Sequence, residues 1–369
     1  MKYYLIAGEA SGDLHGSYLI RAIRALDPAA EVRCWGGDLM AAAGATVVKH
    51  YRELAFMGVV QIVKNLPTIL RNERFCRRDI AAFGPDRLVL IDYSGFNLRI
   101  ARWARPAGYD ISYYISPQVW ASRAGRVREI AANVDRMLVI LPFEEAWYRQ
   151  RGVAATFVGH PLLDVVQRTA QPPAPAPGEP LTVALLPGSR RQEITAGLPR
   201  LLAAAARYPE HRYVVAGAPS QTPAFYADLL GTCVSAPPRL ETVMNDTYAL
   251  LRTAHAAVVT SGTATLETAL FGVPQVVVYR GNWLAYRIAR WMVGDRIKYI
   301  SLVNLVMDAP VVPELIQADF TADKLADHLQ KIIAGPERDR QLKDLRALRE
   351  RLGSGGAARR AAQVIVTSS

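Results

Sequence analysis

The fold of this chain is decided by residues 258–274, which read Val258-Val259-Thr260-Ser261-Gly262-Thr263-Ala264-Thr265-Leu266-Glu267-Thr268-Ala269-Leu270-Phe271-Gly272-Val273-Pro274. The apolar run at 256–259 suits a buried strand, and Gly272 followed by Pro274 predicts the end of a helix. A short polar turn joins the two. A strand followed directly by a helix is the repeating unit of a parallel α/β sheet.

The start of this helix is a candidate anion site. Backbone N–H groups at a helix start favour an anion such as a diphosphate. Glu267 lies one turn further along, on the same face as Thr263, where a carboxylate can accept hydrogen bonds from a ribose diol. An ordinary capped helix with a solvated glutamate explains the same residues, so this stretch alone leaves both interpretations open. The candidate contacts are Ser261, Gly262, Thr263, Ala264 and Glu267.

A second such unit stands at the start of the chain. The strand predicted at 3–7 runs into Gly8-Glu9-Ala10-Ser11-Gly12-Asp13-Leu14-His15-Gly16. The glycines recur every four residues, which is not the G-x-G-x-x-G spacing of a dinucleotide fingerprint. Ser11, Gly12 and Asp13 are candidates for a ligand loop, and His15 is a candidate general base. A capped turn with a surface histidine is the alternative.

Further predicted strands also end in polar turns. The run at 87–91 ends at Asp92, at the carboxyl end of a strand, where α/β proteins bind ligands. The strand at 183–186 leads into Pro187-Gly188-Ser189-Arg190. Backbone N–H groups and a guanidinium in such a turn are good contacts for a phosphate. A capping role for Asp92 and a turn with surface arginines remain as alternatives.

A proline-rich segment at 171–180 is the clearest boundary in the chain. We expect a first domain at 1–170 and a second at 181–339, with the C-terminal helical segment 340–369 as a candidate to complete the first. Two Rossmann-like halves without a dinucleotide fingerprint suggest the GT-B architecture, an α/β fold. In that architecture the donor nucleotide binds the second half, the acceptor lies against the first, and the cleft between them holds the chemistry.

Composition limits the class of protein. The 369 residues include 51% hydrophobic residues, and 44 basic against 33 acidic residues give a net charge of +11, which points to an anionic partner. The basic runs lack the interleaved aromatics of a nucleic-acid module. No apolar run approaches the ~20 residues of a membrane span. The apolar stretch 56–70, followed by Arg71, Arg74, Arg77 and Arg78, fits either a membrane-surface segment or two core helices.

Taken together, the motifs resemble lipid-A-disaccharide synthase, a family of inverting GT-B glycosyltransferases. The matching blocks follow the family's order along nearly the whole chain, and the ordered set is far more specific than any one of them. They are Ala7 to Asp13, Phe56-Met57-Gly58, Ile91-Asp92 with Phe96-Asn97, Ser116-Pro117 with Val119-Trp120-Ala121, Leu141-Pro142-Phe143-Glu144, Val158-Gly159-His160-Pro161, Leu185 to Arg190, Ser261 to Ala264 with Leu266-Glu267, and Ser301-Leu302 with Asn304.

The resemblance implies a reaction in which UDP-2,3-diacylglucosamine donates its sugar to 2,3-diacylglucosamine 1-phosphate (lipid X). The products are a β-1,6-linked disaccharide 1-phosphate and UDP. It also implies a place on the cytoplasmic face of the inner membrane of a Gram-negative bacterium. No metal or other cofactor and no nucleic acid is expected, an anionic membrane surface is an expected partner, and a homo-oligomer is compatible with the sequence.

The implied donor site consists of Gly188, Ser189, Arg190, Ser261, Gly262, Thr263, Ala264, Glu267 and Asn304, and the implied acceptor cleft of Ser11, Gly12, Asn97 and Ser116. One departure concerns the catalytic base. Many family members have an Asp where this chain has Gly95. We therefore rank Asp92 or Asp13 first as the base, followed by His15, and assign stabilisation of the leaving diphosphate to Arg190.

Three rivals remain at this stage. A UDP-N-acetylglucosamine 2-epimerase, or another soluble GT-B enzyme, would share the donor site. A catalytically silent nucleotide-sugar-binding or adaptor protein is disfavoured because the loop at 8–13, Arg190 and Glu267 occur together. A nicotinamide enzyme is disfavoured by the missing fingerprint.

Overall fold

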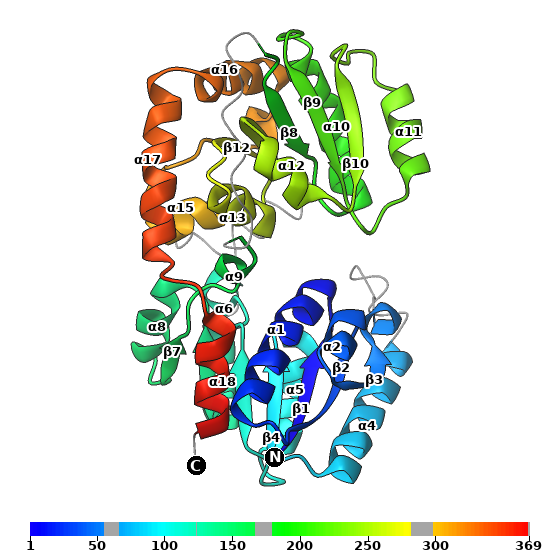
Figure 1. Ribbon diagram of the computed structural model, residues 1–369, viewed down its shortest axis with the longest axis vertical. Coiled ribbons are helices and arrows are strands. Elements are labelled where there is room, and N and C mark those ends of the chain that lie inside the picture. Colours follow the sequence, from blue (N-terminus) through cyan, green and yellow to red (C-terminus); the bar gives the residue numbers. More distant parts are fainter. Residues whose placement is uncertain (55–65, 123, 167–178, 282–297, 368–369) are drawn as a thin grey trace. The chain divides into compact units, whose positions relative to one another are not determined.

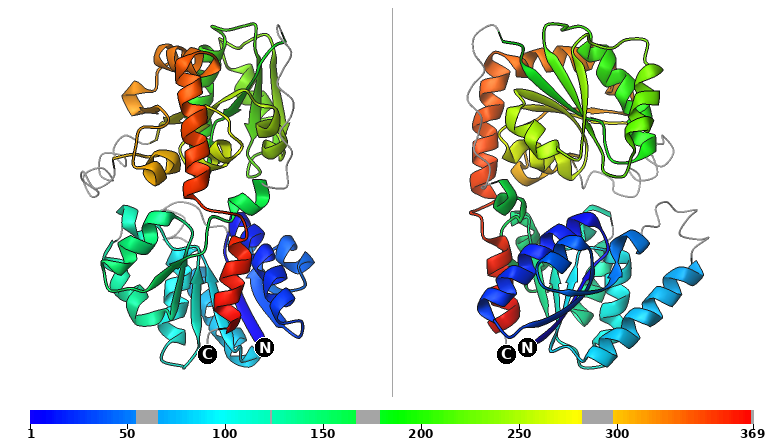
Figure 2. Two further views of the ribbon diagram at one scale, coloured as in Figure 1. Left: turned by 60° about the vertical axis from the view of Figure 1, so that its left-hand side comes forward. Right: turned by 45° about the vertical axis from the view of Figure 1, so that its right-hand side comes forward.

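The computed structural model describes residues 1–54, 66–122, 124–166, 179–281 and 298–367. The chain forms two compact units, one of residues 1–164 with 354–369 and the other of residues 165–353. Each unit is a parallel sheet with helices on both faces, as Figure 1 and the two further views of Figure 2 show. The predicted α/β GT-B fold class, with two doubly wound parallel sheets, is confirmed.

The sheet of the first unit has the strand order β3-β2-β1-β4-β5-β6-β7, and all its described strand pairs are parallel. Its strands are β1 (Lys2–Ala7), β2 (Glu31–Gly36), β3 (Thr46–His50), β4 (Arg87–Ile91), β5 (Ile111–Tyr114), β6 (Arg136–Val139) and β7 (Ala155–Phe157). Its helices are α1 (Ala10–Leu26), α2 (Asp38–Ala42), α4 (Leu66–Phe83), α5 (Ser94–Ala104), α6 (Val119–Ser122), α7 (Val127–Asn133), α8 (Pro142–Arg149) and α18 (Ala357–Thr367), with 3-10 turns η1 (Tyr51–Leu54) and η2 (Ala124–Arg126). The short helix α9 (Leu162–Val166) spans the boundary at 164.

The central strands are apolar on both faces because helices cover both faces. In β1, Tyr4 and Ile6 pack into one buried cluster, whereas Tyr3 and Leu5 pack into another on the opposite face. All four side chains are fully buried. This is the continuous apolar pattern expected of a strand inside a parallel sheet.

The sheet of the second unit has the order β10-β9-β8-β11-β12-β13 and is also parallel throughout its described pairs. Its strands are β8 (Thr182–Leu186), β9 (Arg212–Gly217), β10 (Leu240–Met244), β11 (Ala256–Thr260), β12 (Gln275–Tyr279) and β13 (Glu314–Ile316). Its helices are α10 (Arg191–Ala205), α11 (Pro223–Gly231), α12 (Thr247–Thr253), α13 (Thr263–Leu270), α15 (Leu302–Met307), α16 (Ala322–Ile333) and α17 (Pro336–Arg351), with the 3-10 turn η4 (Gln317–Asp319).

The C-terminal segment differs from the single unit we expected at 340–369. It contains two helices that belong to different units, α17 in the second and α18 in the first. Helix α18 packs on α1 (Figure 1), and its buried face consists of four alanines and Ile365. Most of the proline-rich segment 171–180, namely residues 171–178, lies outside the described residues.

Among the described helices, none combines the length and the apolar composition that a membrane span requires.

Candidate active site

Both sheets have a topological switch point, where the strand order reverses and neighbouring loops diverge. In the first unit this point lies between β1 and β4, and in the second between β8 and β11. Ligands of open α/β sheets bind outside the carboxyl ends of the strands at such points. Most of the candidate site residues follow these four strands, whereas Ser116 follows β5 and Asn304 lies in α15.

Asp92 follows β4 in a strained turn at the first switch point. Asp92 and Tyr93 have φ of 46° and 45°, the left-handed region that non-glycine residues rarely adopt. The carbonyl oxygen of Asp92 accepts hydrogen bonds from Asn97 Nδ2 at 2.9 Å and from the Tyr113 hydroxyl at 2.5 Å. A strain of about 1–3 kcal/mol per residue persists only where the surroundings enforce it, typically at functional sites.

The carboxyl group of Asp92 is electrostatically unusual. Burial, with a further contribution from the nearby Glu9 carboxylate, raises its pKa to about 6. Glu9 follows β1, the strand next to β4. Glu144, at the start of α8, is also buried, and burial raises its pKa to about 7. A carboxylate with a pKa just below neutrality suits a general base.

Two predicted residues of the first unit make hydrogen bonds within the protein. The Asp13 carboxylate accepts hydrogen bonds from the backbone N–H groups of Gly37, Leu39 and Met40 at 2.8, 3.2 and 3.0 Å, which fixes the start of α2. Asn97 is fully buried and holds the Asp92 turn. Asp13 and Asn97 are thus both engaged within the protein, and their roles as base and as acceptor-cleft residue stay predictions.

The remaining polar candidates divide into buried and exposed groups. Ser116, a predicted acceptor-cleft residue, is buried, with its hydroxyl 2.7 Å from that of Tyr148. Ser11 is exposed on the first turn of α1. Burial lowers the pKa of His15 to about 4, so this histidine is neutral at pH 7, and its Nδ1 atom is buried without a hydrogen-bond partner.

The four-residue glycine spacing has a packing explanation. A Cβ atom at Gly8 would lie 2.4 Å from the ring of Tyr93. A Cβ atom at Gly12 would lie 3.0 Å from Ala7 Cβ, and one at Gly16 would lie 2.7 Å from Met40 Sδ. Gly12 therefore allows α1 to approach β1, and Gly8 allows the first loop to pass beneath Tyr93.

The donor candidates of the second unit lie side by side because β8 and β11 are paired. Gly188 has φ of +109°, which favours glycine, and a Cβ atom there would lie 3.3 Å from Thr260 Cγ2. The side chain of Arg190 is 71% exposed and donates to Glu193 Oε1 at 2.7 Å. The Ser189 carbonyl oxygen accepts from the Ser220 hydroxyl at 2.7 Å. The phosphate-binding turn predicted from sequence thus has an exposed cation at its end.

Helix α13 begins beside that turn. Its start has no capping side chain, and Gly262 and Thr263 are exposed while Ala264 is partly buried. Glu267 accepts a hydrogen bond from the Tyr248 hydroxyl at 2.8 Å. Burial raises the pKa of Glu267, and the hydrogen bond from Tyr248 opposes this shift. No local sequence pattern links Tyr248 to Glu267, because Tyr248 lies on a different helix, α12.

Two further donor candidates are engaged within the protein. Ser261 donates its N–H to the Val278 carbonyl and its hydroxyl to the Ile300 carbonyl, each at 2.9 Å. The Asn304 side chain is buried and bonds Val312 through both its oxygen and its nitrogen, at 2.9 Å each. Both residues make hydrogen bonds within the protein, and their assignment as donor contacts stays a prediction.

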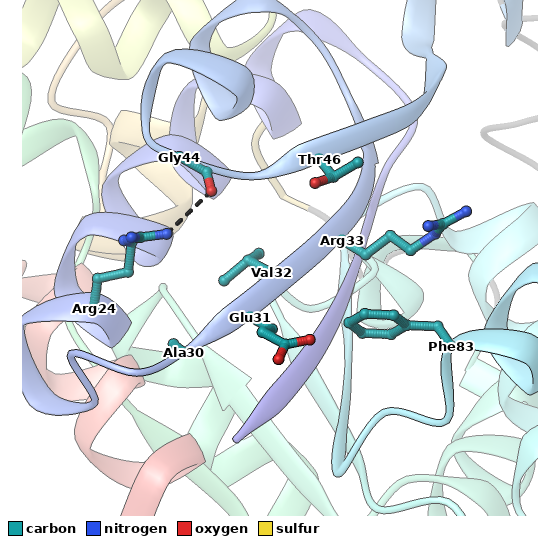
Figure 3. Close-up of a pocket in the computed structure, with 8 residues that line it drawn as sticks. All are labelled: Arg24, Ala30, Glu31, Val32, Arg33, Gly44, Thr46 and Phe83. Carbon is teal, nitrogen blue, oxygen red and sulfur yellow. Dashed lines mark hydrogen bonds between the residues drawn. The ribbon is translucent and has the colours of Figure 1, made fainter.

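A pocket of about 270 Å³ lies elsewhere, at the amino ends of β2 and β3 (Figure 3). Arg24 donates to the Gly44 carbonyl at its rim, and Arg33 and Phe83 line the other side. The pocket therefore lies at the amino ends of the strands, whereas Asp92 lies at the carboxyl end of β4. Within the described residues, no three His, Cys, Asp or Glu side chains converge in a way that could hold a metal ion.

Two Rossmann-like sheets, each with polar loops at its switch point, place the protein in the GT-B class, which contains glycosyltransferases and nucleotide-sugar epimerases. The solved glycotransferase of kitacinnamycin has a TM-score of 0.66 at 17% identity, covering 99% of this chain and 98% of that one. The UDP-GlcNAc 2-epimerase from Neisseria meningitidis, bound to UDP-GlcNAc, has a TM-score of 0.60 at 11% identity over 99% and 98%. At these identities the likeness concerns the fold alone.

The chain belongs to the lipid-A-disaccharide synthetase family, whose model matches residues 3–367. A lipid-A-disaccharide synthase from Syntrophus aciditrophicus (strain SB) is 40% identical over 373 residues, which cover 98% of this chain and 96% of that protein. The predicted family and the predicted glycosyltransferase class are thereby confirmed, and the match over the full length favours the synthase over the epimerase alternative.

Proposed function

We propose that this protein transfers 2,3-diacylglucosamine from UDP-2,3-diacylglucosamine to lipid X, forming the β-1,6-linked disaccharide 1-phosphate and UDP. The observation that carries the proposal is the presence, in one chain of this family, of two complementary sites. One unit has a cation and an uncapped helix start for a diphosphate. The other has a carboxylate with a pKa of about 6.

In the proposed mechanism, Asp92 accepts the proton of the acceptor 6-hydroxyl as the oxygen attacks the anomeric carbon. The bond between that carbon and the diphosphate oxygen breaks, and its electron pair leaves with UDP. Attack from the opposite face inverts the anomeric configuration. The transition state resembles an oxocarbenium ion, as in glycoside hydrolysis.

The leaving diphosphate gains negative charge in this step. Arg190 and the N–H groups of Gly188, Ser189 and residues 262–264 are the donors we assign to it, and Glu267 is assigned to the ribose. Preorganised donors of this kind stabilise developing charge without reorganisation. Because Arg190 is paired with Glu193 in the free protein, the diphosphate competes with that carboxylate for the guanidinium.

A lipid-bearing acceptor requires contact with a membrane surface, and we assign this contact to the region around α4. Leu70 and Phe75 are 44% and 38% exposed on α4, beside the exposed Arg71, Arg74 and Arg78. The remainder of the predicted apolar segment, residues 56–65, lies outside the described residues. Apolar side chains flanked by arginines suit an anionic lipid surface. These side chains support a membrane contact, and the cytoplasmic face of the inner membrane is the location that the family resemblance implies.

The test is a product assay with purified protein. Diacylated UDP-glucosamine is supplied with and without lipid X, and disaccharide 1-phosphate and UDP are measured. We expect both products only when lipid X is present. Epimerisation of UDP-N-acetylglucosamine without any acceptor would favour the epimerase, and binding of UDP without either reaction would favour a catalytically silent protein.

A further inference from the structure

One carboxylate on the edge strand β13 organises the turn that precedes α15. Glu314 Oε1 accepts hydrogen bonds from the Ser301 backbone N–H and from Asn304 Nδ2, each at 2.9 Å. Glu314 Oε2 accepts from the Ile300 backbone N–H at 3.0 Å. Three donors that lie within five residues of the chain thus converge on the two oxygens of one side chain.

The turn at residues 300–301 also contacts the loop before α13. Helix α13 itself packs on α15. The Ile300 carbonyl oxygen, fixed by the bonds around it, accepts the hydroxyl proton of Ser261 at 2.9 Å. The Ser261 N–H donates to Val278 on β12. Ser261 is therefore held by two hydrogen bonds. These bonds fix the residue that directly precedes the backbone N–H groups of residues 262–264.

We propose that Glu314 is a positioning residue of the nucleotide-sugar site, which acts through Ile300 and Ser261 to fix the loop that receives the diphosphate. The inference rests on the proposed function, because it takes the ligand of that loop to be a nucleoside diphosphate sugar. Helix α13 has only eight residues, and Gly262 adds backbone freedom just before it. Without an anchor, the loop would lose entropy on binding the diphosphate, and affinity would fall.

The chemistry of the cluster requires a carboxylate rather than an amide. An ionised carboxylate only accepts hydrogen bonds, whereas a glutamine side chain presents an NH₂ group on one side. Glu314→Gln therefore turns that NH₂ group toward one of the three donors. The variant keeps the size of the side chain but leaves one of the three donors without an acceptor.

The experiment measures UDP binding to the full chain by isothermal titration calorimetry. We expect Glu314→Gln to weaken UDP binding roughly five- to tenfold, equivalent to the loss of about one buried hydrogen bond. Ser261→Ala removes the hydrogen bond from the Ser261 hydroxyl to the Ile300 carbonyl and should weaken UDP binding to a similar extent. The double variant should be no weaker than the stronger single variant, because both changes break the same connection.

The matched control is Glu241→Gln. Glu241 lies on the other edge strand of the same sheet and is paired with Arg212 at 2.6 Å, remote from the loop in strand order. It should bind UDP as the unaltered protein does. In the transfer assay, Glu314→Gln should raise the KM for the UDP-sugar donor and leave the KM for the acceptor unchanged, which a general loss of folded protein would not do.

Unchanged UDP affinity in Glu314→Gln, or effects of the two single variants that add in the double variant, would overturn the inference while leaving the proposed function intact. If Glu314→Gln does not fold, unchanged affinity in Ser261→Ala overturns it equally. If the unaltered protein does not bind UDP, the proposed donor site itself fails, and the role of Glu314 there fails with it.

Discussion

Replacing Asp92 with asparagine should make the protein more stable and nearly inactive. The folded-state pKa of Asp92 is raised from 3.8 to about 6. A difference of about two pKa units, at about 1.4 kcal/mol each, corresponds to roughly 3 kcal/mol of stability lost when the group ionises at neutral pH. Because a buried amide also carries a desolvation cost, we expect Asp92→Asn to gain about 1–3 kcal/mol at pH 8.

The stability gained by Asp92→Asn should decrease as the pH falls. Since the folded-state pKa lies above that of the unfolded chain, the cost of the ionised carboxylate is complete above about pH 6 and vanishes as the pH falls below about 4. Urea denaturation should therefore show the advantage of Asp92→Asn shrinking steadily from pH 8 toward pH 4. A constant advantage across this range would refute the assignment of the raised pKa to Asp92.

The carboxyl group of Asp92 should also set the acidic limb of the pH profile of kcat/KM. We expect kcat/KM of the unaltered protein to fall as the pH drops through about 6, and Asp92→Asn to lose about 10²–10⁴-fold at pH 8. Glu9→Gln removes a neighbouring negative charge and should move the limb to lower pH. Glu145→Gln, on the exposed Glu145–Arg149 pair of α8, is the control and should not move it. Activity of Asp92→Asn within tenfold of the unaltered protein would exclude Asp92 as the base.

Three further predictions concern the donor site and the lipid-facing surface. Arg190→Ala should lower kcat/KM about 10²–10³-fold, whereas Arg191→Ala, whose guanidinium lies over the Phe225 ring, should have little effect; equal losses would contradict the role of Arg190. Glu267→Ala should weaken UDP binding about tenfold in calorimetry without changing the affinity for inorganic pyrophosphate, since Glu267 is assigned to the ribose; weakening of both would argue against that. Leu70→Ser with Phe75→Ser should reduce sedimentation with anionic liposomes roughly tenfold, while Leu39→Ser, 43% exposed on α2, should not; equal binding by all variants would place the lipid-facing surface elsewhere.

Local patterns in the sequence were enough to predict the α/β class and to select the loops that we propose carry the chemistry. Apolar runs marked the buried strands, and the polar turns that follow them marked the carboxyl ends where such sheets bind ligands. Asp92, Arg190 and Glu267 were selected in this way, and the ordered blocks indicated the family. These signals are local, because a strand and the turn after it are contiguous in the chain.

Only the tertiary structure showed which of the candidate side chains are engaged by other parts of the protein. Asp13 and Asn304 bond to groups distant in sequence or in a neighbouring element. Asn97 Nδ2 donates to the Asp92 carbonyl, whereas its Oδ1 atom is buried without a hydrogen-bond partner. The roles of Glu9, Tyr248 and Glu314 likewise depend on partners from other elements.

The physical reason is that sheet order is not sequence order. Strand β1 pairs with β4, and β8 pairs with β11, across intervening strands and helices. Which donor finds which acceptor, and how far a carboxylate is removed from water, follow from that pairing. The sequence by itself determined the chemical groups available at each strand end, and the folded structure decided which of them are free to react.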